Sequence, residues 1–314
     1  MGEGGGTPVE HRRRAVLAAG VTGLAAALTG CAARGSAGSP PASRAGSRAS
    51  GGPEAFARLE ERFGGRLGVF ALDTGSGMTA GHRAGERFLM CSTVKCLVVA
   101  AILHRASAEP GLLERRVRYT RADLLAHAPV ARQRLATGMT VGELCEAALT
   151  VSDNTAENLL TAHLGGPAAT TAFVRSLGDP VTRCDRTEPA LNDRAPGDER
   201  DTSTPSWFVR DLRRLAFAGP LAPGRRTALL RWMTACTTGA AQIRAGVPHG
   251  WQVADKTGSG TAGDSHDVGI VRPPGRAPVV LAVFTEPDDP HSTAGRATIA
   301  AATSAALAAL GVRP

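Results

Sequence analysis

Lysine is almost missing from this sequence. Of its 36 basic residues only Lys95 and Lys256 are lysines, and the other 34 are arginines. A guanidinium serves well for surface charge, but it does not release a proton near neutral pH, whereas a buried ammonium can. We therefore expect these two positions to require lysine. Chance retention explains the pair equally well when the neighbouring residues are ignored.

Aromatic residues are also scarce, at 4% of the chain, so the core must be built largely from Ala, Val and Leu. The net charge of +8 invites a nucleic-acid interpretation. Against it, the arginines are scattered, no stacking aromatics are interleaved with them, and no binding motif appears. We predict no nucleic-acid partner; an anionic small molecule or an acidic envelope surface fits the charge equally well.

Paired cysteines are absent too. Beyond Cys31, none of the cysteines forms a CxxC motif or a Cys/His set with zinc spacing. Their number is odd, so they cannot all pair, and lone cysteines are usually buried thiols. We predict no metal and no cofactor. The five cysteines are Cys91, Cys96, Cys145, Cys184 and Cys236.

The N-terminus has the features of an export signal. Three arginines at 12–14 precede an apolar stretch, 15–28, that is too short to span a bilayer comfortably. We predict a signal peptide over 1–30 of twin-arginine type. The segment 28–31 resembles a bacterial lipobox, which makes Cys31 a lipidation site; ordinary cleavage nearby, with Cys31 incidental, is the alternative. The protein is then secreted or lipid-anchored at the cell surface, and 31–53 is a flexible tether.

Beyond the tether, the periodicity and turn signals predict strand-rich ends that enclose a helical middle. This pattern favours an α+β fold with a discontinuous sheet domain. A capping box at Thr140 and a proline after Thr204 mark two helix starts. The expected helices cover 54–63, 94–103, 141–151, 155–164, 205–215 and 294–310, and the expected strands cover 66–73, 250–257, 267–271 and 279–285.

Ser92 and Lys95 form an S-x-x-K motif near the start of a buried helix. A serine hydroxyl needs a base within hydrogen-bonding reach to become a nucleophile. Residues three apart share one helix face, so Lys95 meets Ser92 there. The helix start also directs N–H groups and positive dipole toward the reacting centre. Alone the motif is weak, because it occurs by chance about once in a chain of this length.

Two further motifs have ordinary explanations when each is taken separately. Ser152-Asp153-Asn154 stands at a junction between helices, where these residue types are preferred caps. Lys256-Thr257-Gly258-Ser259-Gly260 ends a strand, where a hairpin with a surface lysine is the simple interpretation. The functional alternative is a proton relay at the first motif and a carboxylate-binding strand at the second, with glycine allowing close approach.

In this order and spacing the three motifs are the set found in class A β-lactamases and penicillin-binding proteins. The chain from about 54 to 310 resembles a class A serine β-lactamase. The segment 186–192, Arg-Thr-Glu-Pro-Ala-Leu-Asn, matches that family's omega loop, here about 183–201. The resemblance implies that Glu188 and Asn192 hold the deacylating water and that Arg186 and Asp201 close the neck of the loop.

The resemblance also implies the architecture: a three-layer α/β/α fold whose antiparallel sheet is flanked by the N- and C-terminal helices. The sheet domain would comprise 54–88 and 235–314, and the helical domain, 89–234, would be inserted between them. The active site would lie between the two domains.

The same resemblance assigns a role to each motif residue. Ser92 would attack the β-lactam carbonyl, Lys95 or Glu188 would accept its proton, and Ser152, beside Lys256, would protonate the departing nitrogen. The backbone N–H groups of Ser92 and Ser259 would form the oxyanion hole. The substrate-binding residues would be His127, Asn154, Asn192, Thr257, Gly258, Ser259 and Arg296.

Several positions depart from familiar members of the family. The two places that usually supply a carboxylate-binding arginine hold Ser265 and Gln242, so we expect Arg296 to provide the cation. His127 stands where an aromatic gate residue is usual; a surface histidine is the alternative. Two familiar disulfides are excluded, because the partner of Cys91 is Gly260 and the partner of Cys145 is Val99. A carbapenemase assignment is therefore unsupported.

The expected function is hydrolysis of β-lactam antibiotics by a monomer without cofactors. A cell-wall peptidase shares the three motifs, and a β-lactam-binding module would be acylated and stop there. Glu188 with Asn192 argues against both alternatives.

Overall fold

The computed structural model describes residues 1, 2 and 52–312. Apart from residues 1 and 2, the predicted signal peptide lies outside this range, as do the predicted lipidation site Cys31 and the tether up to residue 51. Helix α1 spans Gly52–Phe63 and so begins two residues before its predicted start. Pro53 is tolerated in a first helical turn, where its missing N–H has no partner to lose. Gly52 lies against the C-terminal helix α8 (Gly295–Ala309), where an added Cβ would meet that of Ala309 at 3.1 Å.

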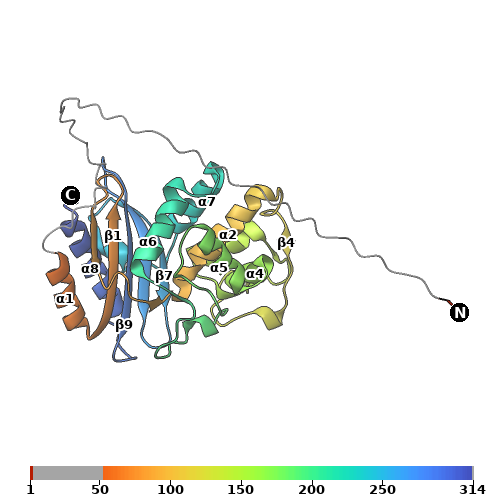
Figure 1. Cartoon of the computed structure of the whole chain (residues 1–314), viewed down its shortest axis with the longest axis horizontal. Coiled ribbons are helices and arrows are strands. Elements are labelled where there is room, and N and C mark those ends of the chain that lie inside the picture. The colour runs from red at the N-terminus through yellow and green to blue at the C-terminus, as the bar shows by residue number, and fades with distance from the viewer. Residues whose placement is uncertain (3–51, 313–314) are drawn as a thin grey trace, which may run out of the picture. The chain divides into compact units, whose positions relative to one another are not determined.

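A five-stranded antiparallel sheet, in the order β2-β1-β9-β8-β7, forms the centre of the fold (Figure 1). Strands β1 (Gly65–Asp73) and β2 (Thr79–His82) come from the beginning of the described chain. Strands β7 (Gln252–Ser259), β8 (Ser265–Arg272) and β9 (Val279–Pro287) come from its end. The β1–β9 pair therefore joins the two parts of the chain within one sheet; in this pair Gly65 faces Pro287 and Asp73 faces Val279.

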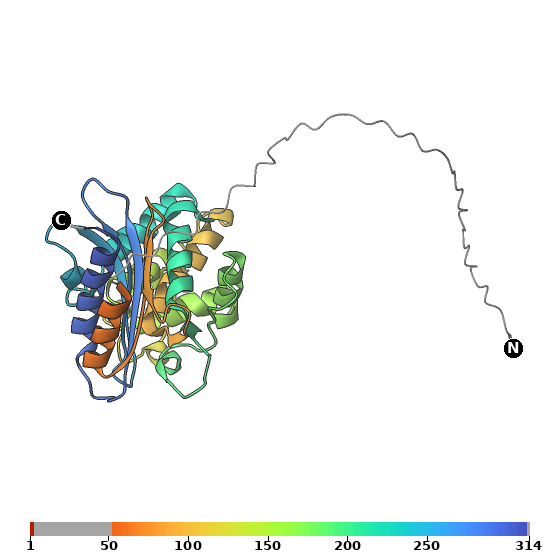
Figure 2. The same ribbon diagram turned by 60° about the vertical axis from the view of Figure 1, so that its left-hand side comes forward.

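Helices cover both faces of this sheet, as Figure 2 shows. Helices α1 and α8 (Gly295–Ala309) lie on one face, and α6 (Pro205–Arg213) and the remaining helices lie on the other. Each face has its own apolar cluster: Phe56, Leu281 and Ile299 belong to the first, and Phe208 and Phe284 belong to the second. The fold is α+β, as the sequence predicted. The exact domain limits given above stay a prediction.

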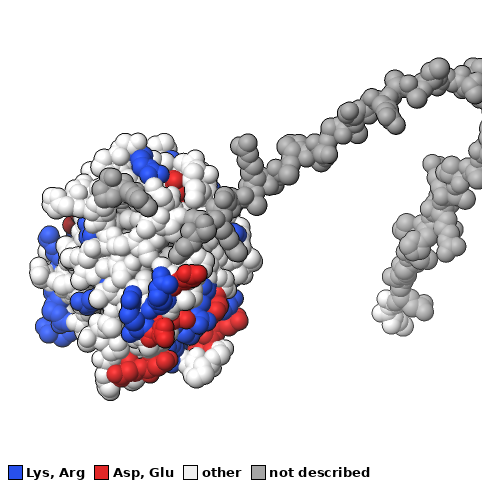
Figure 3. Space-filling model, turned by 90° about the vertical axis from the view of Figure 1, so that its left-hand side faces the viewer, with Lys and Arg blue, Asp and Glu red and all other residues white. Residues whose placement is uncertain are grey.

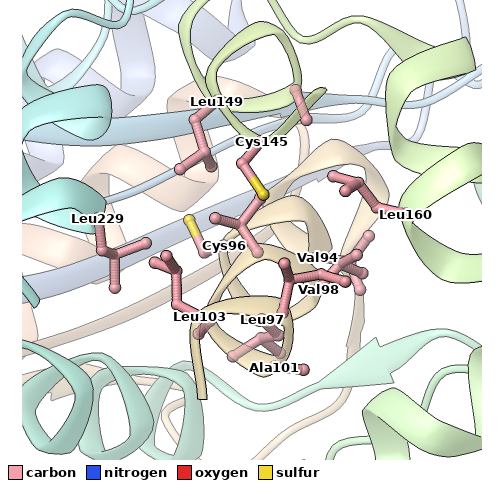
Figure 4. Close-up of a cluster of buried hydrophobic side chains, with 14 of the residues drawn as sticks. Val94, Cys96, Leu97, Val98, Ala101, Leu103, Cys145, Leu149, Leu160 and Leu229 are labelled. Carbon is pink, nitrogen blue, oxygen red and sulfur yellow. The ribbon is translucent and has the colours of Figure 1, made fainter. Parts of the chain in front are cut away.

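Helix α2 (Lys95–Ala108) is the central helix of the second cluster. Every residue from Lys95 to Leu103 is buried, which explains why this stretch shows no polar face. The segment Cys91–Ala108 is long and apolar enough to cross a membrane, but 72% of it is buried inside the protein, as in a core helix. Figure 4 shows its side chains meeting those of Leu149, Leu160 and Leu229 from neighbouring helices.

The helical part also contains α3 (Val141–Thr150), α4 (Asn154–Leu164), α5 (Pro167–Ser176) and α7 (Pro223–Thr234). Helices α5 and α7 were not predicted, although each has proline in its first turn, a helix-start signal. Four two-residue strands were not predicted either; they pair as β3 (Phe88–Leu89) with β6 (Thr202–Ser203) and β4 (Arg116–Val117) with β5 (Met139–Thr140). Strands this short carry no readable alternation.

The five cysteines of the described chain are buried, free thiols. Burial raises the pKa of the Cys91, Cys96, Cys145 and Cys184 thiols, so these groups are protonated at neutral pH. Cys96 and Cys145 lie among the apolar side chains around α2 (Figure 4). The thiols therefore act as small core residues.

Many arginines are neutralised locally. On the face that carries α1 and α8, blue and red residues gather side by side and leave much of the surface white (Figure 3). Arg83, for example, contacts both Glu60 and Glu86, and Arg66 contacts Glu86 and Glu286. Arginine pairing of this kind leaves little charge of one sign on that face.

Candidate active site

Ser92 lies in a single 3-10 turn, Cys91–Val94, that leads into α2. Cys91 has a φ of 46°, a conformation that few non-glycine residues adopt and that turns the chain sharply before the serine. The Nζ atom of Lys95 lies 2.7 Å from Ser92 Oγ. The predicted meeting of these two side chains is therefore present, although Ser92 stands in the turn before the α-helix rather than within it.

Lys95 is completely buried and surrounded by oxygen atoms. Its Nζ lies 2.6 Å from Asn154 Oδ1, 2.9 Å from Glu188 Oε1 and 3.2 Å from the carbonyl oxygen of Ser152. A buried ammonium is costly unless it is paired and hydrogen-bonded, and this one has both kinds of partner. The lysine thereby links Ser92 to Ser152, Asn154 and Glu188.

Glu188 joins Ser92 to Asn192. Ser92 Oγ donates to Glu188 Oε1 at 3.1 Å, and Asn192 Nδ2 donates to Glu188 Oε2 at 2.5 Å. The backbone of Glu188 is fixed by Asn158 on α4, whose amide group accepts from Glu188 N and donates to Glu188 O, both at 2.9 Å. One carboxylate thus contacts the serine on one side and an amide on the other.

The segment that carries Glu188 is closed at its neck as predicted. Arg186 Nε donates to Asp201 Oδ2 at 2.6 Å, and Asp201 Oδ1 accepts from the backbone N–H groups of Asp185 and Arg186. Charge-assisted contacts of this geometry are the strong ones. They hold the two ends of the loop together beneath Ser92.

The side chains of Ser152 and Lys256 are in direct contact at the wall of the cleft. Lys256 Nζ donates to Ser152 Oγ at 3.0 Å and to Thr257 O at 2.7 Å, and its side chain is fully buried. Burial, together with the positive charge of Lys95, lowers the pKa of Lys256 to about 8. Asp153, between Ser152 and Asn154, caps α4 by accepting from Ala156 N at 2.9 Å, so the capping interpretation of this motif holds for its middle residue.

Gly258 lets β7 approach the serine turn. A Cβ atom at this position would lie 2.9 Å from Met90 O and 3.2 Å from Cys91 Cβ. Contacts this short are not tolerated between a real side chain and a backbone carbonyl. Only glycine therefore places the strand edge next to Ser92.

A cavity of about 320 Å³ brings the predicted site residues together. Lys95 and Lys256 lie buried beneath it, and all the other predicted residues line it. His127 is exposed, with its Nε2 3.0 Å from Val151 O, and Arg296 is exposed at the start of α8. The predicted lining residues are Ser92, His127, Ser152, Asn154, Glu188, Asn192, Thr257, Gly258, Ser259 and Arg296.

The same cavity is lined by Thr238 and Gln242. Thr238 Oγ1 lies 2.6 Å from Thr257 Oγ1. Thr238 was not predicted from the sequence, because it stands in an irregular segment without a motif. Its proximity to β7, which carries Thr257, arises only from the folding of the chain.

Three comparisons with known proteins agree with this geometry. A family model described as "Beta-lactamase enzyme family" matches residues 53–310. Beta-lactamase AST-1 of Nocardia asteroides is 46% identical over 299 residues, which cover 95% of this chain and 96% of that protein. The carbapenem-hydrolyzing beta-lactamase KPC of Klebsiella oxytoca is 48% identical, covering 82% and 89%. A solved class A beta-lactamase from Mycobacterium abscessus has a TM-score of 0.81 and 56% identity, covering 83% and 99%.

Proposed function

The chain belongs to the class A β-lactamases, and from this membership we propose that it hydrolyses β-lactam antibiotics through a covalent intermediate on Ser92. The observation that carries the proposal is the position of Ser92 Oγ, between Lys95 Nζ at 2.7 Å and Glu188 Oε1 at 3.1 Å. A nucleophilic serine needs a base at such a distance. The reaction destroys the antibiotic and so confers resistance.

In the first half of the proposed reaction, Ser92 Oγ attacks the β-lactam carbonyl carbon. Its proton passes to Lys95, when this side chain is the neutral amine, or, through a water molecule, to Glu188. Both groups lie within hydrogen-bonding distance of Ser92 Oγ, so either can act as the base. The backbone N–H groups of Ser92 and Ser259 stabilise the oxyanion. The C–N bond then breaks, and Ser152, hydrogen-bonded to Lys256, gives its proton to the ring nitrogen. The proton taken from Ser92 replaces it through Lys95, whose Nζ lies 3.3 Å from Ser152 Oγ, so the base is free again for the second half.

In the second half, water attacks the ester formed on Ser92. Glu188 accepts a proton from this water, Asn192 orients it, and the proton returns to Ser92 Oγ as the acyl group leaves. The 2.5 Å contact between Asn192 and Glu188 supports these two roles, since it places both side chains at one water site. A peptidase that transfers its acyl group to another amine has no need of such a pair.

The remaining cleft residues bind the substrate in this proposal. Asn154 binds the side-chain amide of the antibiotic, and Thr257 and Ser259 bind its carboxylate. Arg296 supplies a positive charge, because Ser265 and Gln242 cannot. His127 forms the edge of the cleft. The protein acts as a monomer and needs no cofactor.

Replacing Glu188 by Gln tests the deacylation role. The amide cannot accept the proton of the attacking water, so the acyl-enzyme should accumulate and turnover of a penicillin should fall by about 10² to 10⁴-fold. Intact-protein mass spectrometry during turnover measures the adduct. Glu146→Gln, at an exposed position of α3, is the matched control. Unimpaired turnover by Glu188→Gln would remove the proposed role.

Failure of the native protein to hydrolyse a chromogenic cephalosporin, with a stable adduct instead, would favour a binding module.

We also propose that the protein is exported and anchored by a lipid on Cys31. The twin arginines at 12–14 and the lipobox-like 28–31 support this proposal. Mass spectrometry of the mature N-terminus from the producing cell tests it. A diacylated Cys31 is the expected terminus, and an unmodified terminus at another residue would refute the anchor.

A further inference from the structure

Glu188 and Asn192 are carried by the omega loop, whose far side is poorly supported. The Arg186–Asp201 pair joins the two ends of the loop at its neck. Beyond the neck, a cavity of about 590 Å³ separates residues 193–200 from the body of the protein. Its other walls include Arg66, Arg87 and Glu286. Packing is the usual means of fixing a loop, and here much of that packing is missing.

Arg194 crosses this gap from the loop to the sheet. Its Nη2 donates to Pro287 O at 3.2 Å, at the end of β9. Its Nε lies 3.5 Å from Asp264 Oδ1 and its Nη1 lies 3.7 Å from Glu286 Oε2. A single guanidinium thus contacts the turn between β7 and β8 and the end of β9, because its planar fork can serve several acceptors.

Asp264 depends on this arginine. Its side chain is fully buried, and neither of its carboxylate oxygens has a hydrogen-bond partner among the described residues. Arg194 is the cation nearest to it in this part of the structure, whereas Glu286 is also bound by Arg66 and by Leu89 N. Burial raises the pKa of the Asp264 carboxyl, and the charge of Arg194 opposes this rise. A buried carboxylate without a partner is costly, so the two groups hold each other in place.

The turn that contains Asp264 also contacts the catalytic part of the loop. Thr261 Oγ1 donates to Asn192 O at 3.3 Å. Asp264 O accepts from Gly260 N at 3.1 Å, which fixes the turn directly after Ser259. Arg194 follows Asn192 by two residues, so anchoring Arg194 restricts the backbone next to Asn192.

We propose that Arg194 is a positioning residue for deacylation. By bridging Asp264 and Glu286 it fixes residues 193–200, the outer part of the omega loop, and thereby the Asn192–Glu188 pair. This inference rests on the proposed function of Glu188. It takes Lys95 as the base of acylation and does not extend to that step, because Lys95 contacts Ser92 and Ser152 directly, without residues 193–200 of the loop.

The test separates the two halves of the reaction. In Arg194→Ala, deacylation and kcat should fall by about tenfold, since small misplacements of reacting groups cost this much or more. The acylation rate, measured as the pre-steady-state burst, should stay within about twofold of the native rate. Arg200→Ala removes a charge from the same loop, but among the described residues the Arg200 guanidinium pairs only with Asp198 of that loop, so this control should change neither rate.

Further variants test the bridge itself. Arg194→Lys keeps the charge but not the fork, so it should recover part of the lost rate. Asp264→Asn should slow deacylation in the native background and add little in Arg194→Ala, because the two act through one contact. Melting temperatures identify any misfolded variant, and Arg194→Lys then carries the test.

Three results would overturn the inference: unchanged deacylation in Arg194→Ala, an equal loss of acylation and deacylation, or additive effects of the Arg194 and Asp264 substitutions. If the native protein shows no acyl-enzyme turnover at all, the proposed function fails instead.

Discussion

Glu157 is a second buried glutamate beside the Lys95–Glu188 pair. It stands one residue before Asn158, which fixes the Glu188 backbone, and only 2% of it is exposed. Its Oε2 has no hydrogen-bond partner among the described residues. Burial raises the pKa of Glu157 to about 8; Lys95 opposes this rise and the negative charge of Glu188 adds to it. At neutral pH this carboxyl is therefore protonated, and Lys95 is left to pair with Glu188.

Replacing Glu157 by Gln should change how stability depends on pH. With a pKa of about 8 in the folded state and about 4.5 when unfolded, Glu157 contributes stability that is complete below pH 4.5 and is lost as the pH rises through 8. Glutamine cannot ionise, so its stability lacks this pH dependence. The melting temperature of the variant minus that of the native protein should therefore be several degrees higher at pH 8 than at pH 5. Thermal unfolding at these two pH values measures the gain. Glu61→Gln, exposed on α1, is the control, and a pH-independent difference would contradict the expectation.

Helix α3 shows how an element's boundary follows from its sequence. Thr140 accepts from Glu143 N at 3.1 Å, and Glu143 Oε2 accepts from Thr140 N at 2.7 Å, which is the predicted capping box. Local signals of this kind were sufficient for α3 and α4. They were overlooked at α5 and α7, and the two-residue strands offered none. The 3-10 turn at Ser92 was also beyond local analysis, because no sequence signal marks the positive φ of Cys91.

Removing the cap should loosen α3 without touching the cleft. Thr140→Ala leaves the Glu143 N–H without its partner and should cost about 1 kcal/mol of unfolding free energy. Denaturant unfolding measures the loss, and Thr140→Ser, which keeps the hydroxyl, should restore most of it. Activity per folded molecule should not change. A loss of activity larger than the loss of folded protein would show that α3 contributes to the site.

At the scale of the whole molecule, the sequence predicted the class of fold but not the strand order. Strand-rich ends and a helical middle indicated α+β, yet the β1–β9 pair joins residues more than two hundred positions apart, and no local pattern encodes it. The same limit applies to the site. The motif residues were found because their order resembled a known family, whereas Thr238 and Arg194 acquire their contacts only in the folded chain.

The two lysines have one more consequence. Both are completely buried, so the folded domain presents no lysine amine to solvent, although its surface is rich in arginine. Reagents that couple to primary amines would therefore find no lysine side chain on residues 52–312. An amine-reactive dye would leave this folded domain unlabelled and its catalytic face free.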